Sequence, residues 1–319
     1  SYGVIDEVHC VSEWGQDFRF TYLHLGRNMY NYVRSKNGIV TLFGLTATAS
    51  FDVLADVERE LSGHGSYTLD SDALVRCEDT NRLELQYRII PVPIEFCENT
   101  EYDKKGYIDP SLPRPVKINA HDRNCGKSSQ LQGIIDEIPN MSRELMTRES
   151  INRIVNRFYE RQSSTPVNNA GSALPVDFPD DFASSKETYQ QAGIVFCPHR
   201  TKTDTSVEVC AARLMKRNKS IGRFYSLDDD YDLSADGSFD PMQNMTDFRD
   251  NKLPIMVATK AFGMGIDKPN VRFTINMNYS NSLESFVQEA GRAGRDKSMA
   301  LSLILVSDYR LVRIKNKCD

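Results

Sequence analysis

The chain has 319 residues, of which 40% are hydrophobic and 26% charged, and its formal net charge is −5. This composition excludes a wholly disordered chain, and no apolar run reaches the roughly 18 residues that a membrane span needs. The N-terminus has no basic stretch followed by an apolar core, so a signal peptide is not expected. The seven cysteines form no Cys-x-x-Cys pair, which favours reduced thiols in a cytoplasmic protein over disulfides or a zinc site.

Hydrophobic patterning predicts strands and helices that alternate at both ends of the chain. In the first ninety residues, strands are expected at 2–5, 39–45 and 83–92, and helices at 22–34 and 51–61. After residue 190, strands are expected at 193–197, 254–258, 271–276 and 300–306, and helices at 205–216 and 282–290. Strands separated by helices predict α/β units with a parallel sheet. Between them, residues 95–190 have weak periodicity and many polar residues, which favours an insertion, a linker or a small helical subdomain.

Two adjacent carboxylates, Asp6 and Glu7, follow the first predicted strand. A buried strand that ends in two carboxylates is the Walker B arrangement, in which the first binds Mg²⁺ and the second orients the water that attacks a γ-phosphate. An Asp-Glu pair also occurs at strand ends that bind nothing, so the pair alone leaves both interpretations open.

The residues that follow this pair narrow the choice. Residues 6–19 (DEVHCVSEWGQDFR) resemble the helicase II box and the aromatic-rich loop of RecQ-family DNA helicases, which usually read Asp-Glu-Ala-His and Cys-x-Ser-x-Trp-Gly-His-Asp-Phe-Arg-Pro. Trp14 and Phe18 offer flat faces for stacking on unpaired bases, and Arg19 can contact a phosphate. The alternative is that both aromatic residues belong to a core. Gln16 and Phe20 replace the usual His and Pro of that loop.

Residues 44–49 (GLTATA) resemble the helicase III box of the same family. The resemblance implies that Thr46 and Thr48, together with His9 of box II, couple the state of the γ-phosphate to the other lobe. A Thr-Ala-Thr turn by itself is also consistent with a helix cap.

The strongest resemblance lies in residues 257–273 (VATKAFGMGIDKPNVRF), which match the RecQ-type helicase V box almost residue for residue. Here Gly265 permits close backbone approach to a nucleotide, Asp267 can accept a hydrogen bond from a ribose hydroxyl, and Thr259 would contact a DNA phosphate. Residues 194–200 (IVFCPHR) fit box IV more loosely and leave Arg200 as a further phosphate contact.

Residues 288–296 (QEAGRAGRD) match the helicase VI box. Arg295, with Arg292 beside it, would act as an arginine finger that neutralises charge on the γ-phosphate, and Gln288 would take part in coupling. Surface salt bridges are the alternative role for the two arginines.

A motor of this class also needs a phosphate-binding loop, Gly-x-x-x-x-Gly-Lys-Ser/Thr. The one Gly-Lys-Ser of the sequence is 126–128, where His121 takes the place of the first glycine and the chain order is wrong for the family. A strand–loop–helix pattern around it leaves phosphate binding open as a minor alternative. The chain alone is therefore expected to have negligible ATPase activity.

The resemblance implies RecA-like lobes of the P-loop NTPase type, with the first lobe truncated and the second complete but interrupted. Residues 1–80 would be the C-terminal half of the first lobe, 81–94 with 191–319 the second lobe, and 95–190 an insertion. It further implies ATP and Mg²⁺ as cofactors, DNA at a single-strand/duplex junction as partner, and 3′-to-5′ unwinding in recombination or repair. The cysteine spacing and the lack of a long apolar run predict neither a zinc site nor a membrane partner. Two alternatives remain: a non-catalytic DNA-binding or partner-docking protein, and an ATPase that remodels RNA or nucleoprotein.

Overall fold

The computed structural model describes residues 2–13, 24–35, 40–46, 51–63, 65, 82, 84–96, 126–145, 187–201, 203–218, 220–226, 239–263 and 266–311. The chain divides into two compact units, Ser1–Asn81 and Arg82–Asp319.

The first unit is built on two short parallel strands. β1 (Tyr2–Ile5) pairs with β2 (Thr41–Gly44), and three helices accompany them: α1 (Cys10–Glu13), α2 (Leu25–Ser35) and α3 (Phe51–Leu61). A Cβ at Gly26 would lie 2.1 Å from the Glu60 carbonyl oxygen, so glycine allows α2 to approach α3 closely. The small core of this unit consists of Ile5, Val8, Val11, Val53 and Val57, with Leu25, Met29 and Leu61 packed against it.

The second unit contains a six-stranded sheet in which every pair of neighbouring strands is parallel, as the alternation of strands and helices predicts. The strands lie in the order β3 (Leu85–Phe96), β8 (Ala300–Leu311), β7 (Val271–Asn276), β4 (Ala192–Phe196), β6 (Ile255–Ala258) and β5 (Ile221–Phe224). β3 is longer than its predicted range and includes Pro91 and Pro93. An edge strand tolerates proline because one side of its backbone needs no ladder hydrogen bond.

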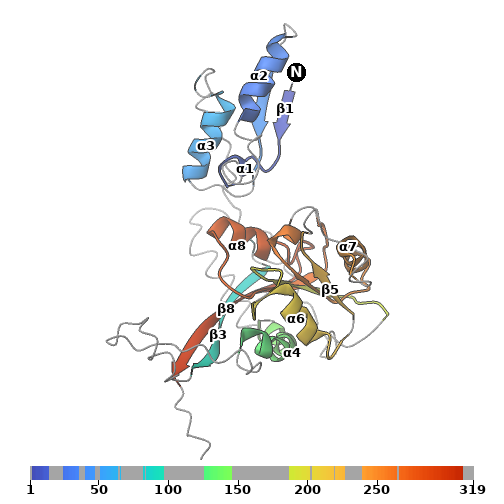
Figure 1. Cartoon of the computed structure of the whole chain (residues 1–319). Coiled ribbons are helices and arrows are strands. Elements are labelled where there is room, and N and C mark those ends of the chain that lie inside the picture. The colour runs from blue at the N-terminus through green and yellow to red at the C-terminus, as the bar shows by residue number, and fades with distance from the viewer. Residues whose placement is uncertain are drawn as a thin grey trace, which may run out of the picture. The chain divides into compact units, whose positions relative to one another are not determined.

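Helices cover both faces of this sheet (Figure 1). α4 (Lys127–Leu145) and α6 (Val207–Leu214) lie on one face, and α7 (Pro241–Arg249) and α8 (Leu283–Ala290) lie on the other, where the short 3₁₀ helix η3 (Lys260–Gly263) also packs. No helix is predicted from the sequence at the position of α7. The Asp240 side chain caps this helix by accepting hydrogen bonds from the backbone N–H groups of Met242 and Gln243, and Pro241 occupies its first turn.

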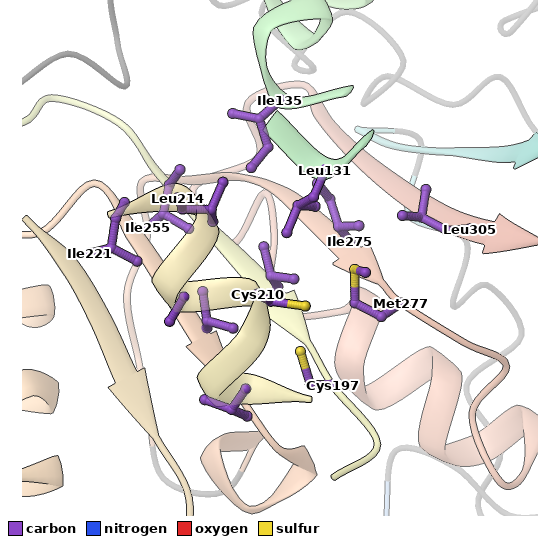
Figure 2. Close-up of a cluster of buried hydrophobic side chains, with 14 of the residues drawn as sticks. Leu131, Ile135, Cys197, Cys210, Leu214, Ile221, Ile255, Ile275, Met277 and Leu305 are labelled. Carbon is purple, nitrogen blue, oxygen red and sulfur yellow. The ribbon is translucent and has the colours of Figure 1, made fainter. Parts of the chain in front are cut away.

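α4 lies inside residues 95–190, the range for which the sequence predicts an insertion, a linker or a small helical subdomain. Its residues Leu131, Ile135 and Ile138 are fully buried in the core between the sheet and α6. Figure 2 shows Leu131 and Ile135 pointing toward the same region as Leu214 of α6 and Ile275 of β7. Residues 127–145 are therefore part of the second unit's core, because three apolar side chains on one helix face are buried against the sheet.

Within the described part of the chain, none of the helices has both the length and the apolar character needed to cross a membrane.

Candidate functional site

The predicted carboxylate pair lies in a tight turn at the carboxyl end of β1. Asp6 and Glu7 are both exposed, and the Glu7 backbone N–H donates to Asp6 Oδ1 at 2.9 Å. Glu7 has a φ of 51°, in the left-handed region that non-glycine residues rarely adopt. Backbone hydrogen bonds from Val8 N to the Leu45 carbonyl and from Leu45 N to the Ile5 carbonyl fix the turn against β2. An unfavourable backbone conformation held by its surroundings is a feature of functional turns.

His9 joins this carboxylate turn to the predicted box III. Its buried imidazole places Nδ1 2.8 Å from Thr46 Oγ1 and 3.3 Å from Glu7 Oε2. Three of the residues proposed for water activation and coupling are thus in direct contact within the first unit. Thr48, which is also proposed for coupling, lies outside the described residues.

The donor atoms of the carboxylate turn suit Mg²⁺. The ion prefers oxygen ligands and is typically held by one or two carboxylates, with waters and substrate phosphates filling the other positions. Asp6 and Glu7 present exposed carboxylate oxygens of this kind. Among the described residues there is no group of three or more His, Cys, Asp or Glu side chains that could hold a metal by itself.

In the second unit, the predicted box VI arginines lie in the turn that follows α8. We call residues 291–295 the arginine turn. Its backbone is fixed by hydrogen bonds from Ala293 N to the Ala290 carbonyl and from Gly294 N to the Val271 carbonyl. Gly294 has a φ of 66° and packs closely enough that a Cβ there would lie 3.0 Å from the Ser298 carbonyl oxygen. The second glycine of the box is therefore required by the backbone conformation.

Arg295 and Asp267 bring boxes V and VI together. Arg295 Nη1 donates to Asp267 Oδ1 at 2.8 Å, and the two side chains are 31% and 87% exposed. An ion pair this exposed contributes only about 0–1 kcal/mol, so another anion can readily replace the carboxylate. Arg292 and Gln288, which are close to Arg295 in sequence, are half-buried. Gly265 lies outside the described residues.

Glu289, near the end of α8 and just before the arginine turn, forms a polar cluster with Asn276 and Ser280 that the sequence did not predict. Glu289 accepts hydrogen bonds from Asn276 Nδ2 and, at 2.5 Å, from Ser280 Oγ. Burial raises the pKa of Glu289, although the hydrogen bonds from Ser280 and Asn276 oppose this effect. The one sequence signal was the placement of Glu289 within box VI, next to Gln288.

An ion pair between a buried arginine and a partly exposed aspartate fixes the backbone just after the arginine turn. Arg272, on β7, is almost fully buried and forms an ion pair with Asp296. Burial by itself would raise the pKa of Asp296, but hydrogen bonds from Arg272 and Ser298 outweigh it and the pKa is lowered. The residue that follows Arg295 is therefore held ionised against the sheet.

Lys268, directly after Asp267, points into the protein. Its Nζ donates to Asn251 Oδ1 at 2.6 Å and to the Arg249 carbonyl at 3.3 Å, and it lies 5.1 Å from the centroid of the Phe248 ring. Burial lowers the pKa of Lys268 to about 8, although Asp250 acts in the opposite direction. Lys268 thereby fixes the segment just after Asp267 to the end of α7.

The proposed DNA contacts are only partly described. Thr259 and Arg200 follow the carboxyl ends of β6 and β4, where parallel sheets generally bind their ligands. Arg200 packs with its Cζ 4.9 Å from the centroid of the Tyr225 ring. Thr259 donates its backbone N–H to the Phe224 carbonyl at 3.1 Å. The other three proposed DNA contacts lie outside the described residues: Trp14, Phe18 and Arg19.

In the Gly-Lys-Ser tripeptide at 126–128, the side chains of Lys127 and Ser128 hydrogen-bond to acceptors inside the protein. Lys127 is 6% exposed, and its Nζ donates at 2.8–2.9 Å to the carbonyls of Met277 and Leu305 and to Asn278 Oδ1. Ser128 donates both its backbone N–H and its hydroxyl to the Asp204 carboxylate. Because a lysine binding three internal acceptors has no donor left for a phosphate, this tripeptide is a structural anchor for α4.

Comparison with known proteins agrees with the boxes. Residues 179–297 match the helicase conserved C-terminal domain. The chain is 27% identical over 302 residues to the probable ATP-dependent DNA helicase RecS of Bacillus subtilis, a match that covers 95% of this chain. It is also 27% identical to the ATP-dependent DNA helicase Q1 of Mus musculus, over 98% of this chain. Over nearly its whole length the chain is thus similar to DNA helicases of the RecQ type.

The relatives are considerably longer proteins. The chain spans 40% of the Bacillus subtilis helicase and 33% of the mouse helicase. Among solved structures, the DUF1998 helicase MrfA bound to DNA matches 97% of this chain and 30% of its own, with a TM-score of 0.50 at 15% identity. That likeness supports an α/β fold with parallel sheets.

Proposed function

We propose that this chain is part of an ATP-dependent DNA helicase of the RecQ type, which couples ATP hydrolysis to 3′-to-5′ unwinding during recombination or repair. Its DNA partner would be a junction between single strand and duplex. The observation that carries this proposal is the contact between Arg295 and Asp267, because it joins the two most specific sequence boxes at an exposed site.

In the second unit, Asp267 and Arg295 would exchange their mutual ion pair for contacts with the nucleotide. The Asp267 carboxylate accepts a hydrogen bond from the ribose, and the guanidinium of Arg295, with Arg292 beside it, binds the γ-phosphate. A guanidinium bound to a phosphoryl oxygen lowers the free energy of a transition state in which negative charge accumulates on that group. The half-buried position of Arg295 favours this role, since a partly desolvated cation interacts more strongly with an anion.

In the first unit, Asp6 would hold Mg²⁺ and Glu7 would orient the attacking water. The metal supplies neutralisation of phosphate charge when bound. Glu7 accepts a hydrogen bond from the water, and the contact of its Oε2 with His9 Nδ1 restrains the carboxylate. His9 also contacts Thr46, so movement of Glu7 on hydrolysis would be transmitted to box III, with Thr48 and Gln288 as further coupling residues.

DNA would be bound by Thr259 and Arg200 at the carboxyl ends of β6 and β4, and by the aromatic loop that contains Trp14, Phe18 and Arg19. Phosphate contacts by such residues are independent of base sequence and weaken as salt rises.

The 319-residue chain alone would hydrolyse ATP negligibly, because the lysine of its Gly-Lys-Ser tripeptide binds internal acceptors. DNA-stimulated hydrolysis by this purified chain that disappears in Arg295→Ala would contradict this expectation.

The decisive experiment uses the complete gene product and a forked DNA duplex with a 3′ single-stranded tail. ATP-dependent strand separation is expected, with little activity on a matched RNA duplex or on a fork with a 5′ tail. Glu7→Gln, which keeps the size of the side chain and its hydrogen bonding to His9, is expected to abolish hydrolysis while ATP still binds.

Salt-sensitive DNA binding without any effect of nucleotide would instead favour a non-catalytic DNA-binding protein. Activity confined to RNA would favour a remodelling ATPase.

A further inference from the structure

Arg82, the first residue of the second unit, contacts the arginine turn from the far end of the sequence. Its Nη1 donates to the Gly291 carbonyl and its Nη2 to the Ala293 carbonyl, both at 2.7 Å. The third donor, Nε, contacts Glu84 Oε1 at 2.8 Å. The two carbonyls belong to the residues on either side of Arg292.

The hydrogen bond to Gly291, the C-cap of α8, satisfies a carbonyl that a helix end leaves without a partner, and the hydrogen bond to Ala293 satisfies a carbonyl of the turn beyond it. α8 ends at Ala290, and the last carbonyls of a helix have no partner within the helix. A cation at this position also interacts favourably with the helix dipole. Because the guanidinium is planar and its donors are rigidly spaced, the fork fixes the separation of the Gly291 and Ala293 carbonyls. The backbone that carries Arg292 is thereby held on both sides.

Glu84 in turn holds Arg82 in this position. The Glu84 carboxylate is buried, and its Oε1 accepts from Arg82 Nε and lies 3.8 Å from Lys297 Nζ. Moving Arg82 away would leave a buried carboxylate without its closest cation, which is strongly unfavourable. The Glu84 carbonyl accepts from Ala300 N, and Glu84 Cγ lies 3.2 Å from the position of a Cβ on Gly294. Glu84 therefore contacts the turn as well as Arg82.

We propose that Arg82 is a positioning residue for Arg292 and Arg295, acting through the backbone of the arginine turn. The proposal rests on the proposed ATPase function, and Arg82 itself contacts no nucleotide. Sequence spacing gave no sign of this role, because Arg82 lies 209 and 211 positions before its two carbonyl partners.

The first test measures the structure of the turn independently of activity. Hydrogen exchange by mass spectrometry on the 319-residue chain compares Arg82→Ala and Arg82→Lys with Arg88→Ala, a neighbouring arginine on β3 whose ion pair with Glu144 is distant from the turn in sequence. We expect the amides of 291–297 to exchange at least tenfold faster in Arg82→Ala, and to an intermediate degree in Arg82→Lys, which keeps the charge but loses the fork. Arg88→Ala should leave these amides unchanged.

If Arg82→Ala does not fold, Arg82→Lys carries the test, with the exchange of β4 and β7 as an internal control. Unchanged exchange at 291–297 in a folded Arg82 variant would overturn the proposal.

The second test measures ATP hydrolysis by the complete gene product at saturating DNA. Loss of positioning should lower kcat at least tenfold in Arg82→Ala with KM for ATP changed by less than about threefold, and Arg82→Lys should recover part of kcat. An unchanged kcat would overturn the proposal. If the unmodified protein hydrolyses no ATP, the proposed function fails, and the exchange experiment still decides whether Arg82 orders the turn.

Discussion

Two regions of the second unit carry a glycine followed by a cation at a helix end, and they behave in opposite ways. At the start of α4, Lys127 of Gly126-Lys127-Ser128 is 6% exposed and binds three internal acceptors. After α8, Arg295 of the arginine turn is 31% exposed and pairs with an Asp267 side chain that is 87% exposed. The lysine donates its hydrogen bonds within the protein, whereas the arginine can exchange its carboxylate partner for another anion.

Whether a cation can bind a phosphate therefore depends more on its partners in the folded protein than on the motif that contains it. A buried lysine must satisfy its donors internally, and losing them leaves carbonyls and an ammonium group desolvated without compensation. An exposed ion pair is nearly neutral in free energy, so a ligand can displace it at little cost. The two sites should therefore respond to substitution with opposite losses, one of stability and one of activity.

The largest effect is expected at Arg295. In the complete gene product, Arg295→Ala should lower kcat for DNA-stimulated ATP hydrolysis by about 10³-fold or more, the usual contribution of an arginine finger. Its thermal unfolding should be nearly unchanged, since the ion pair that is lost is exposed. Steady-state kinetics and calorimetry together check this. A large loss of stability with normal kcat would remove the distinction between the two regions.

Lys127→Met should show the reverse. Removing the ammonium leaves the Met277 and Leu305 carbonyls buried without their donor, so the free energy of unfolding should fall by about 3 kcal/mol. ATP binding and kcat of the folded fraction should be retained. Urea unfolding and nucleotide titration at low temperature provide the measurement. A variant of normal stability that had lost ATP binding would make 126–128 a phosphate site after all.

Lys268 extends the comparison to a lysine inside a helicase box. Its pKa is about 8 in the folded chain against an ordinary value of 10.5, so between these values the unfolded chain binds more protons. The contribution of this group to stability therefore rises with pH across that window, by at most roughly 1.4 kcal/mol per pH unit. The difference in unfolding free energy between the unmodified chain and Lys268→Met should increase from pH 8 to 10. The exposed Lys252, replaced by Met, is the matched control. A flat difference for Lys268 would mean that its ammonium is solvated like that of Lys252.

The smallest effect is expected for the ion pair between Arg217 and Asp136, whose side chains are 53% and 41% exposed. Arg217→Ala removes a cation that contacts the same helix as Lys127, but at the surface. The free energy of unfolding should change by about 0.5 kcal/mol or less, and less still in high salt. A change as large as that of Lys127→Met would show that burial does not separate the two cations.

The parallel α/β class and the positions of most strands along the chain could be predicted from hydrophobic runs, because β4, β6 and β7 are short apolar segments buried on both faces. β5 and α7 were not predicted, since Ile221–Phe224 is a weak apolar run and the signal for α7 is confined to its Asp-Pro start. For the candidate site, the contacts of His9 with Glu7 and Thr46 and of Arg295 with Asp267 lie among residues chosen from the boxes. Arg82 was missed because its carbonyl partners are remote in sequence. The contact between Glu289 and Asn276 was missed because Asn276 belongs to no recognised motif.

The residue types of the boxes, their order and the class of fold follow from the sequence, because these depend on local patterns. Which cations are open to a ligand, and where residues 127–145 belong, depends on how distant segments pack. Lys127 lies 150 to 178 positions from its three acceptors, so no local pattern records its burial. Whether a lysine anchors a helix or binds a phosphate depends on desolvation and on hydrogen bonds between distant segments, which exist only once the sheet and its helices are packed.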